Sequence, residues 1–346
     1  MGGFARLSVV VALVVAVAGP SLAAPGGTLE IKTLSLGFGV DPVFAPHIIA
    51  MEKGWFREAG FERVETKTFT AGALAGEALA AGQIQLWTPG NLPPISMRHN
   101  GLPIVVLGTN TLAYIDRLVV RADANVQRPA DLYNIRIGLL EGSVASAVLY
   151  RIAEYYRLDV RRLQVVNLPP PEQLTSLINN NIQAFICWNP WPYLAQQRAN
   201  VKILHTGTVS HFADDDGRKV QTSNTRSIFV VSEDFIRRSP NAARAMMRVL
   251  LRAQLYVSDP KNRDEVIATI SRFLQQPVEQ NRALWGDYVF DPRFDKKYWE
   301  DMKVYTDFLA KTGRIRNPVD PLEYTYTGYV EEFNPALVTL RGKWKP

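Results

Sequence analysis

Side chains suited to noncovalent capture of a small molecule recur in five turns, each directly after a predicted strand. The turns are residues 37–42, 87–91, 108–111, 141–144 and 188–192. Ligands of open α/β sheets bind beyond the carboxyl ends of the strands, so we expect these turns to lie at the same edge of their sheets. Their hydroxyl, amide, carboxyl and aromatic groups predict a binding site.

Gly142 and Ser143 form the clearest chemical element. Ser143 can cap the helix that follows, and Gly142 allows close backbone approach. The free N–H groups and the dipole at that helix end would then favour an anion. Capping without a ligand also explains the serine, and the charge of Glu141 would repel an anion unless its side chain points away.

Three tryptophans and one aspartate add a second kind of chemistry. Trp87, Trp188 and Trp191 offer flat walls for an aliphatic or aromatic ligand body, or for stacking on an ammonium group. Core packing is the alternative for each ring. Asp41 could pair with a ligand amine, or it could serve as a turn residue before Pro42.

No enzyme or cofactor motif accompanies these turns. The four histidines lack metal-ligand spacing, the acidic run 214–216 lacks the spacing of a calcium loop, and no nucleophile elbow, phosphate loop or dinucleotide fingerprint occurs. We therefore expect no catalytic residue, no metal and no cofactor. Cys187 is the single cysteine and lies in an apolar run, which predicts a buried strand residue.

Short apolar runs that alternate with helical patterns must position the turns. Strands are predicted at 34–38, 64–69, 84–87, 104–107, 118–121, 135–140, 163–168, 184–188, 201–204 and 227–231. Helices are predicted at 46–59, 73–81, 143–157, 172–180, 241–257, 263–274 and 298–312. This order predicts two α/β units, each a mostly parallel sheet flanked by helices, plus a helical tail. Since no Pro- or Gly-rich linker separates the units, we expect chain crossings near Ala113 and Ser223 and a ligand cleft between the units.

Residues 1–24 predict a cleavable signal peptide. Arg6 precedes an apolar run at 7–18, and small residues precede cleavage near Ala23 and Ala24. The run is shorter than the roughly 20 residues of a transmembrane helix, and no second run of spanning length follows. We therefore predict a soluble mature protein outside the cytoplasm. The formal charge of +6 is scattered, without a basic stripe interleaved with aromatics, so nucleic acid is not an expected partner.

Four stretches resemble the periplasmic solute-binding proteins of ABC importers, in the nitrate, alkanesulfonate and taurine group, which includes binders of thiamine pyrimidine precursors. The stretches are HIIAMEKGWF at 47–56, AGEALAAGQIQ at 75–85, RIGLLEGS at 136–143 and QAFICWNP at 183–190. Gln85 stands where the group's pattern has Asp. The resemblance extends over essentially the whole mature chain and rests on the order and spacing of the stretches.

The resemblance implies a two-lobed, type II-like periplasmic binding protein, with a first lobe at 29–113 plus 224–346 and a second lobe at 114–223. It implies a ligand at the hinge, closure by rigid-body motion, and delivery to a membrane ABC permease. By the match, Gly142 and Ser143 face an anionic group, and Trp188 and Asn189 line the opposite lobe. We expect a monomer. The expected ligand-binding residues are Phe38, Gly39, Asp41, Phe44, Trp87, Thr88, Gly90, Asn91, Asn110, Gly142, Ser143, Val144, Trp188, Asn189, Trp191 and Asn224.

The ligand favoured at this stage is a small sulfonate or similar organic anion that carries an amine. Ser143 and nearby N–H groups would take the anion, the tryptophans its body and Asp41 the amine. The acidity of Asp41 and Glu141 disfavours inorganic nitrate. The alternatives are a binder of a neutral or aromatic nitrogen compound, a receptor that feeds a sensor, and an enzyme on the same fold, although the cysteine-rich motif of such relatives is absent from this chain.

Overall fold

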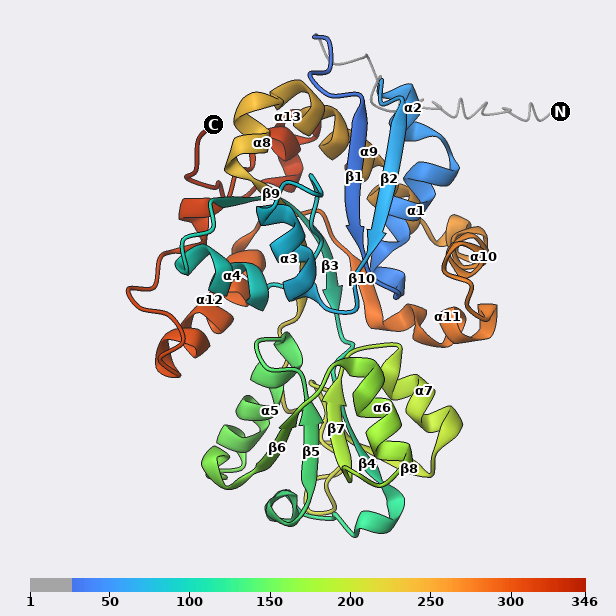
Figure 1. The fold of residues 1–346 in the computed structure, drawn as a ribbon, viewed down its shortest axis with the longest axis vertical. Coiled ribbons are helices and arrows are strands. Elements are labelled where there is room, and N and C mark those ends of the chain that lie inside the picture. Colours follow the sequence, from blue (N-terminus) through green and yellow to red (C-terminus); the bar gives the residue numbers. More distant parts are fainter. Residues whose placement is uncertain (1–26) are drawn as a thin grey trace, which may run out of the picture.

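The computed structural model describes residues 27–346, so the predicted signal peptide lies outside the described residues. Two lobes are joined by two crossing segments, and the larger lobe contains the first described residues and the C-terminus (Figure 1). In the described part of the chain, no helix combines the length and apolar character needed to cross a membrane. The predicted α/β architecture with two lobes is confirmed.

The first lobe contains two sheets. In one, β1 (Thr33–Phe38) pairs in parallel with β2 (Arg63–Thr68). In the other, β3 (Ile104–Ala113) lies between β10 (Tyr288–Phe290) and β9 (Arg226–Ser232) and runs antiparallel to both. The predicted strand at 84–87 is reduced to isolated bridges, in which Leu86 meets β1 and Trp87 meets β9. These bridges connect the two sheets into one layer.

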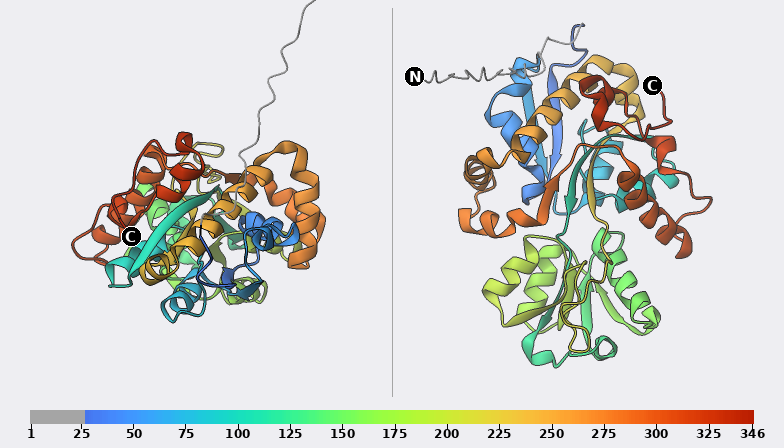
Figure 2. Two further views of the ribbon diagram at one scale, coloured as in Figure 1. Left: turned by 90° about the horizontal axis from the view of Figure 1, so that it is seen from above. Right: turned by 180° about the vertical axis from the view of Figure 1, so that it is seen from behind.

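Helices cover both faces of this layer. The long helix α9 runs behind the strands and packs its apolar face on α1 (Figure 2). The predicted helix at 46–59 is divided by Gly54, whose φ of 71° lies in the left-handed region that glycine adopts at little cost. The helices of this lobe are α1 (Ala45–Glu52), α2 (Trp55–Glu58), α3 (Gly72–Ala80), α4 (Leu92–His99), α8 (Glu233–Arg238), α9 (Pro240–Ser258), α10 (Arg263–Leu274), α11 (Val278–Leu284), α12 (Lys296–Lys311) and α13 (Gly328–Phe333).

The second lobe is a single five-stranded sheet with strand order β6-β5-β7-β4-β8. Its strands are β4 (Arg117–Arg121), β5 (Arg136–Leu139), β6 (Gln164–Asn167), β7 (Ala184–Cys187) and β8 (Val201–His205). Helices α5 (Val144–Tyr155), α6 (Pro170–Ile178) and α7 (Trp191–Arg198) flank it. Cys187 is buried in β7, as predicted.

Strand directions are more mixed than the predicted mostly parallel sheets. β5 runs parallel to β6 and β7, whereas β4 runs antiparallel to β7 and β8. The reason is topological: β4 enters its lobe directly from a crossing segment, so no crossover helix turns it to the direction of its neighbours. The short 3-10 helices are η1 (Pro42–Phe44), η2 (Ala122–Ala124), η3 (Pro129–Asn134), η4 (Val160–Arg162), η5 (Pro260–Asn262), η6 (Trp285–Asp287), η7 (Pro321–Tyr324) and η8 (Pro335–Leu337).

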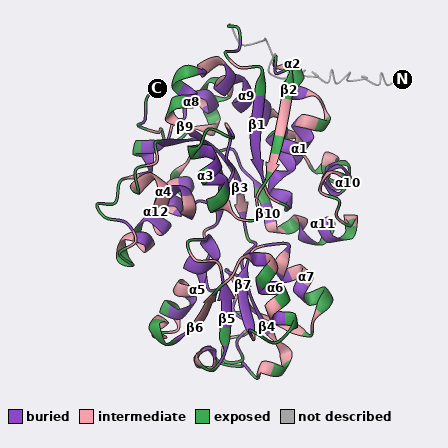
Figure 3. Cartoon of the chain, in the orientation of Figure 1, coloured by how far each residue is buried: buried purple, intermediate pink, exposed green. Residues whose placement is uncertain are grey.

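The crossing segments are residues 114–116, between β3 and β4, and residues 206–225, between β8 and β9. The N–H of Ala113 donates to the carbonyl of Thr225 over 2.9 Å, so the segments lie side by side where they leave the first lobe. Strands β1, β3, β4, β5, β7 and β9 are largely buried, whereas β2 and β6 are more exposed (Figure 3). The boundary of each lobe within these segments stays a prediction.

Candidate ligand-binding site

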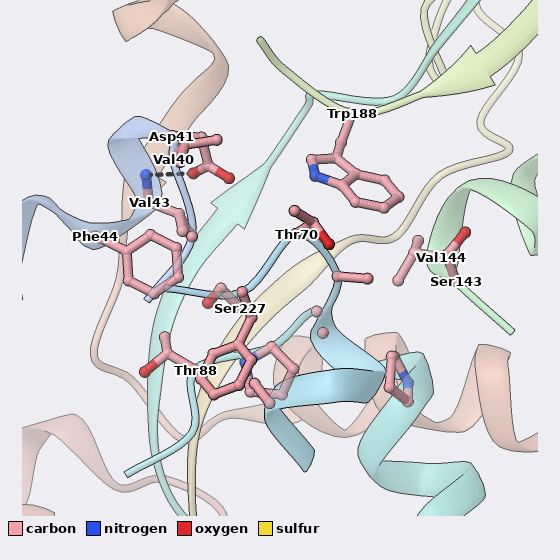
Figure 4. Close-up of a pocket in the computed structure, with 18 of the residues that line it drawn as sticks. Val40, Asp41, Val43, Phe44, Thr70, Thr88, Ser143, Val144, Trp188 and Ser227 are labelled. Carbon is pink, nitrogen blue, oxygen red and sulfur yellow. Dashed lines mark hydrogen bonds between the residues drawn. The ribbon is translucent and has the colours of Figure 1, made fainter. Parts of the chain in front are cut away.

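A cavity of about 280 Å³ lies between the lobes, beside the crossing segments. The first lobe contributes the ends of β1, β2 and β3 and the turn before α4. The second lobe contributes the turns that lead into α5 and α7, and Pro171 at the start of α6. Figure 4 shows Asp41 and Phe44 on one side of this space, with Val144 and Trp188 on the other. The carboxyl ends of strands from both lobes therefore meet at one place.

Aromatic rings form much of the wall. Phe38 and Phe44 stack with ring centroids 5.0 Å apart, and both are buried. Gly39 makes this packing possible, because a Cβ there would lie 2.8 Å from the Phe44 ring. Trp87 of the first lobe and Trp188 of the second lobe also line the cavity, so both lobes offer aromatic surface to a flat ligand body.

Asp41 places a buried carboxyl group in the cavity lining. Its Oδ1 accepts a hydrogen bond from the N–H of Val43 over 2.7 Å and caps η1. Burial raises the pKa of Asp41 to about 7, against the smaller lowering effect of that hydrogen bond. The turn role and the site role predicted for Asp41 are therefore compatible.

The hydroxyl group of Thr88 forms a hydrogen bond with a histidine side chain. His47 Nε2 lies 2.9 Å from Thr88 Oγ1, and both residues are buried. Burial lowers the pKa of His47 to about 3, so the imidazole is neutral at neutral pH. Thr88 thus presents a positioned hydroxyl to the cavity without a positive charge behind it.

Ser143 caps α5 and lines the cavity. Its Oγ donates to the carbonyl of Leu140 over 2.7 Å and accepts from the N–H of Ser146 over 3.3 Å. Glu141 points away from the cavity, because its carboxylate pairs with Arg314 of the first lobe at 2.6 Å. The repulsion that Glu141 could have exerted on an anion is therefore absent from the cavity lining.

Most of the residues expected from the sequence line the cavity: Phe38, Gly39, Asp41, Phe44, Trp87, Thr88, Gly90, Ser143, Val144, Trp188 and Trp191. Five others lie outside the lining: Asn91, Asn110, Gly142, Asn189 and Asn224. Gly142 has a φ of 76° and shapes the turn before the Ser143 cap.

The four asparagines outside the lining donate hydrogen bonds to protein groups. Two of them, Asn91 and Asn224, belong to one network. Asn91 Nδ2 donates to the carbonyls of Asn224 and Asp301, and Asn224 Nδ2 donates to Asp301 Oδ1 over 3.0 Å. Asp301 also forms a fully buried ion pair with Arg226 at 3.2 Å. Both asparagines therefore belong to the polar network behind the cavity wall.

Asn110 lies inside a strand that was predicted to end at residue 107. The turn expected at 108–111 is part of β3, which continues to Ala113. Asn110 Nδ2 donates to the carbonyl of Val43 over 2.9 Å from inside this strand. Gly108 looked like a strand end, but it makes room for Phe229, since a Cβ there would lie 2.8 Å from that ring.

The expected opposition of Ser143 to Trp188 and Asn189 is also wrong. All three belong to the second lobe, where Ser143 precedes α5 and the other two follow β7. The residues that face them across the cavity are those of the first lobe, such as Gly90. A Cβ on Gly90 would lie 3.0 Å from Val144 Cγ2, which shows how closely the lobes approach.

Sequence reasoning missed a turn and part of the hinge. The segment from Thr68, the last residue of β2, through Thr70 to Gly72, the first residue of α3, lines the cavity, and the strand-end rule could have found it. The crossing segments contribute Asp116 and Thr225, and Ser227 of β9 lies beside them. Asp116 is buried, and burial raises its pKa.

No Lys, Arg or His side chain is among the described residues that line the cavity, whereas two aspartates are. The described chain also contains no group of three or more His, Cys, Asp or Glu residues that could hold a metal ion. The arrangement is suited to binding through aromatic contact, hydroxyl groups and carboxyl groups.

Two lobes, two crossing segments and a cavity at their junction are the architecture of the periplasmic binding protein fold. The chain belongs to the NMT1/THI5-like family, which matches residues 41–262, more than half of the chain. The resemblance inferred from the sequence is thereby confirmed.

Relatives of known name fit this assignment. The chain is 27% identical over 207 residues to a Bacillus subtilis (strain 168) protein provisionally named an aliphatic sulfonates-binding protein. It is 23% identical over 217 residues to the taurine-binding periplasmic protein of Escherichia coli (strain K12). These alignments cover 58% and 62% of this chain, and 61% and 64% of the relatives, so the match spans less than two thirds of each relative.

Solved structures show the same fold. The alkanesulfonate-binding protein SsuA from Xanthomonas axonopodis pv. citri, bound to MOPS, aligns with a TM-score of 0.72 at 16% identity, over 86% of this chain and 99% of that chain. The periplasmic nitrate-binding protein NrtA from Synechocystis PCC 6803 aligns with a TM-score of 0.70 at 18% identity, over 90% of each chain.

Proposed function

We propose that the protein captures a small, largely apolar molecule with a nitrogen group and delivers it to an ABC permease. In this proposal it is a monomeric, non-enzymatic receptor of the periplasm. The observation that carries the ligand class is the cavity lining, which combines stacked aromatic rings with two carboxyl groups and has no basic side chain among its described residues.

The electrostatic argument concerns Asp41 and Asp116. Burying a carboxylate is costly unless a partner compensates the charge, and burial raises the pKa of both residues. A cationic or N–H-bearing ligand supplies that partner, and its ring or chain packs between Phe44 and Trp188. An anion would meet uncompensated acidity instead.

A small organic anion is the second candidate. The observation in its favour is the amino-terminal end of α5, where Val144 and Ser143 line the cavity and the first N–H groups of the helix have no intrahelical partner. The names of the sulfonate- and taurine-binding relatives also favour it. The two candidates place the ligand's polar group at different ends of the cavity.

A thermal-shift and calorimetry screen of the purified mature protein separates these candidates. The probes are benzamidine, benzylamine and 2-aminopyrimidine as nitrogen compounds, and benzenesulfonate, ethanesulfonate and nitrate as anions without an N–H group. A compound at 100 times its Kd stabilises the fold by about 2.7 kcal/mol, which gives a clear shift. Stabilisation by the nitrogen compounds is expected. Stabilisation by the anions alone would replace the proposed ligand class with the second candidate.

A further inference from the structure

Asp116 connects the two crossing segments at the cavity. It lies on the first segment, and its Oδ2 accepts hydrogen bonds from Ser223 Oγ over 2.7 Å and from Thr225 Oγ1 over 2.5 Å, both on the second segment. All three residues are buried. One carboxylate oxygen is therefore fully used in holding the hinge segments together.

The other oxygen of the same carboxyl group has no protein partner. Oδ1 of Asp116 is buried and accepts no hydrogen bond from the described residues, although Asp116 lines the cavity. Buried polar atoms are almost always hydrogen-bonded, so an acceptor left open beside a cavity points to a donor that comes from outside the protein.

The nearest basic side chain does not fill this role. Arg117 uses its guanidinium on the backbone carbonyls of Tyr114, Asp116 and Thr206 and on the carboxylate of Asp287. No ion pair between Asp116 and a cation is formed within the described chain. The described chain therefore supplies no paired cation to Asp116, and because burial raises its pKa, a cationic ligand would stabilise the charged form of this carboxyl group.

We propose that Asp116 is a ligand-binding residue that selects for an N–H donor through Oδ1, while Oδ2 holds the two crossing segments together. This inference rests on the proposed function and narrows the ligand to compounds with an ammonium, amidinium or similar N–H group. Such a group completes the hydrogen bonding of Asp116. A sulfonate or nitrate group offers no donor and would face a carboxylate, so the same residue rejects it.

The position of Asp116 also joins ligand capture to the hinge. A donor bound at Oδ1 fixes the carboxyl plane, and that plane fixes the hydroxyls of Ser223 and Thr225 on the other segment. A ligand that makes this contact only when the lobes are together favours the closed arrangement by its differential affinity. The residue therefore contributes to selection and to closure through one carboxyl group.

The test compares Asp116→Asn with Ser223→Ala, using benzamidine and benzonitrile as probes. The two compounds share a ring, but benzonitrile has no N–H donor. Asp116→Asn keeps the size of the side chain and should weaken benzamidine binding by about tenfold to a hundredfold, because a charged hydrogen bond is lost. Benzonitrile binding should change by a few-fold at most. Ser223→Ala removes a hinge contact and leaves Oδ1 intact, so it should also change benzamidine affinity by a few-fold at most.

Comparable losses of benzamidine affinity in both variants would assign Asp116 a structural role and overturn the inference. Equal benzamidine affinity in Asp116→Asn and the wild type would overturn it while leaving the proposed function in place. Wild-type protein that binds only benzenesulfonate would remove both. If Asp116→Asn does not fold, carbon-13 spectra of the carboxyl groups in the wild type give the answer. Benzamidine should lower the pKa of one buried aspartate other than Asp41, whose own signal is identified with the Asp41→Asn variant. The absence of such a pKa change refutes the contact.

Discussion

Asn189 of the second lobe donates a hydrogen bond from Nδ2 to Oδ2 of Asp287 in the first lobe, over 2.8 Å. The other oxygen of Asp287 accepts from Arg117 at 2.9 Å, where the chain enters β4. Trp188, which lines the cavity, is the residue directly before Asn189. The contact therefore ties the turn that carries Trp188 to the opposite lobe and favours the arrangement in which the cavity is formed.

Asp287→Ala should shift the protein toward a more open form. Small-angle scattering of the ligand-free protein should show a larger radius of gyration than the wild type, because two contacts between the lobes are lost. Affinity for a cavity ligand should fall by a few-fold, since part of the binding energy would go into closing the lobes. The control is Asp307→Ala, which removes only an exposed pair with Lys303 on α12. Equal radii for Asp287→Ala and the wild type would show that the contact does not bias closure.

Trp188→Ala should weaken binding of a ring-containing ligand by about tenfold or more, because a large aromatic contact in a desolvated pocket is removed. Tyr193→Ala is the matched control: it is an aromatic residue on the adjacent helix α7 that does not line the cavity. Calorimetric titration of both variants measures the difference. Equal affinities would exclude Trp188 from the ligand contact.

Ser143→Ala separates capping from anion binding. Loss of the cap should lower the free energy of unfolding by about 1 kcal/mol. Benzamidine affinity should stay unchanged, because the proposed contacts to nitrogen lie at Asp41 and Asp116. A loss of benzenesulfonate affinity in this variant, larger than the loss of the helix cap explains, would instead support an anion held at the start of α5.

His205 should make the protein less stable in acid. Its Nδ1 accepts from the N–H of Gly207 over 2.8 Å, and burial lowers the pKa of the ring to about 4. The unfolded chain, with a pKa near 6.5, binds a proton more readily than the folded one. The stability that the neutral ring contributes is therefore present above pH 6.5 and is lost as the pH falls toward 4, by roughly 3 kcal/mol.

His205→Asn keeps an acceptor for Gly207 and removes the titration. Urea unfolding of both proteins between pH 4 and 7 measures the effect, and the difference between the two stabilities should grow in favour of the variant as the pH falls. Parallel pH curves for the two proteins would contradict the assignment.

Strand-end reasoning located the turns around Asp41, Trp87, Ser143 and Trp188 because each follows a short apolar run with a local signal, such as a glycine or a helix cap. These signals act over a few residues and so are readable from the sequence. The same reasoning failed at Gly108, where the glycine serves packing against Phe229 within a continuous strand.

Residues whose role depends on distant partners could not be assigned. Asn91 looked like a site residue, but its amide donates to the carbonyl of Asp301, 210 positions along the chain. No sequence pattern singled out Asp116, and only the meeting of the two crossing segments places Ser223 and Thr225 on its carboxylate. Neither relationship leaves a local pattern, because both come from the topology of the hinge.

The pH dependence of ligand affinity gives a separate test of Asp41. Burial raises its pKa to about 7, so the empty cavity holds a neutral carboxyl group in mild acid and a carboxylate above neutrality. Benzamidine stays protonated across this range and binds the carboxylate. Its affinity should therefore rise by roughly tenfold per pH unit up to about pH 7 and level off above it, with one proton released on binding in the rising part.

Asp41→Asn should remove most of this slope in calorimetric titrations from pH 5 to 8. Asp116→Asn should leave the slope that belongs to Asp41. Tyr288 lies near Asp41, but burial raises its phenol pKa well above the usual value, so it stays neutral throughout. Affinity that does not change with pH in the wild type would mean that Asp41 does not meet the cation, and a slope that persists in Asp41→Asn would assign the proton to another group.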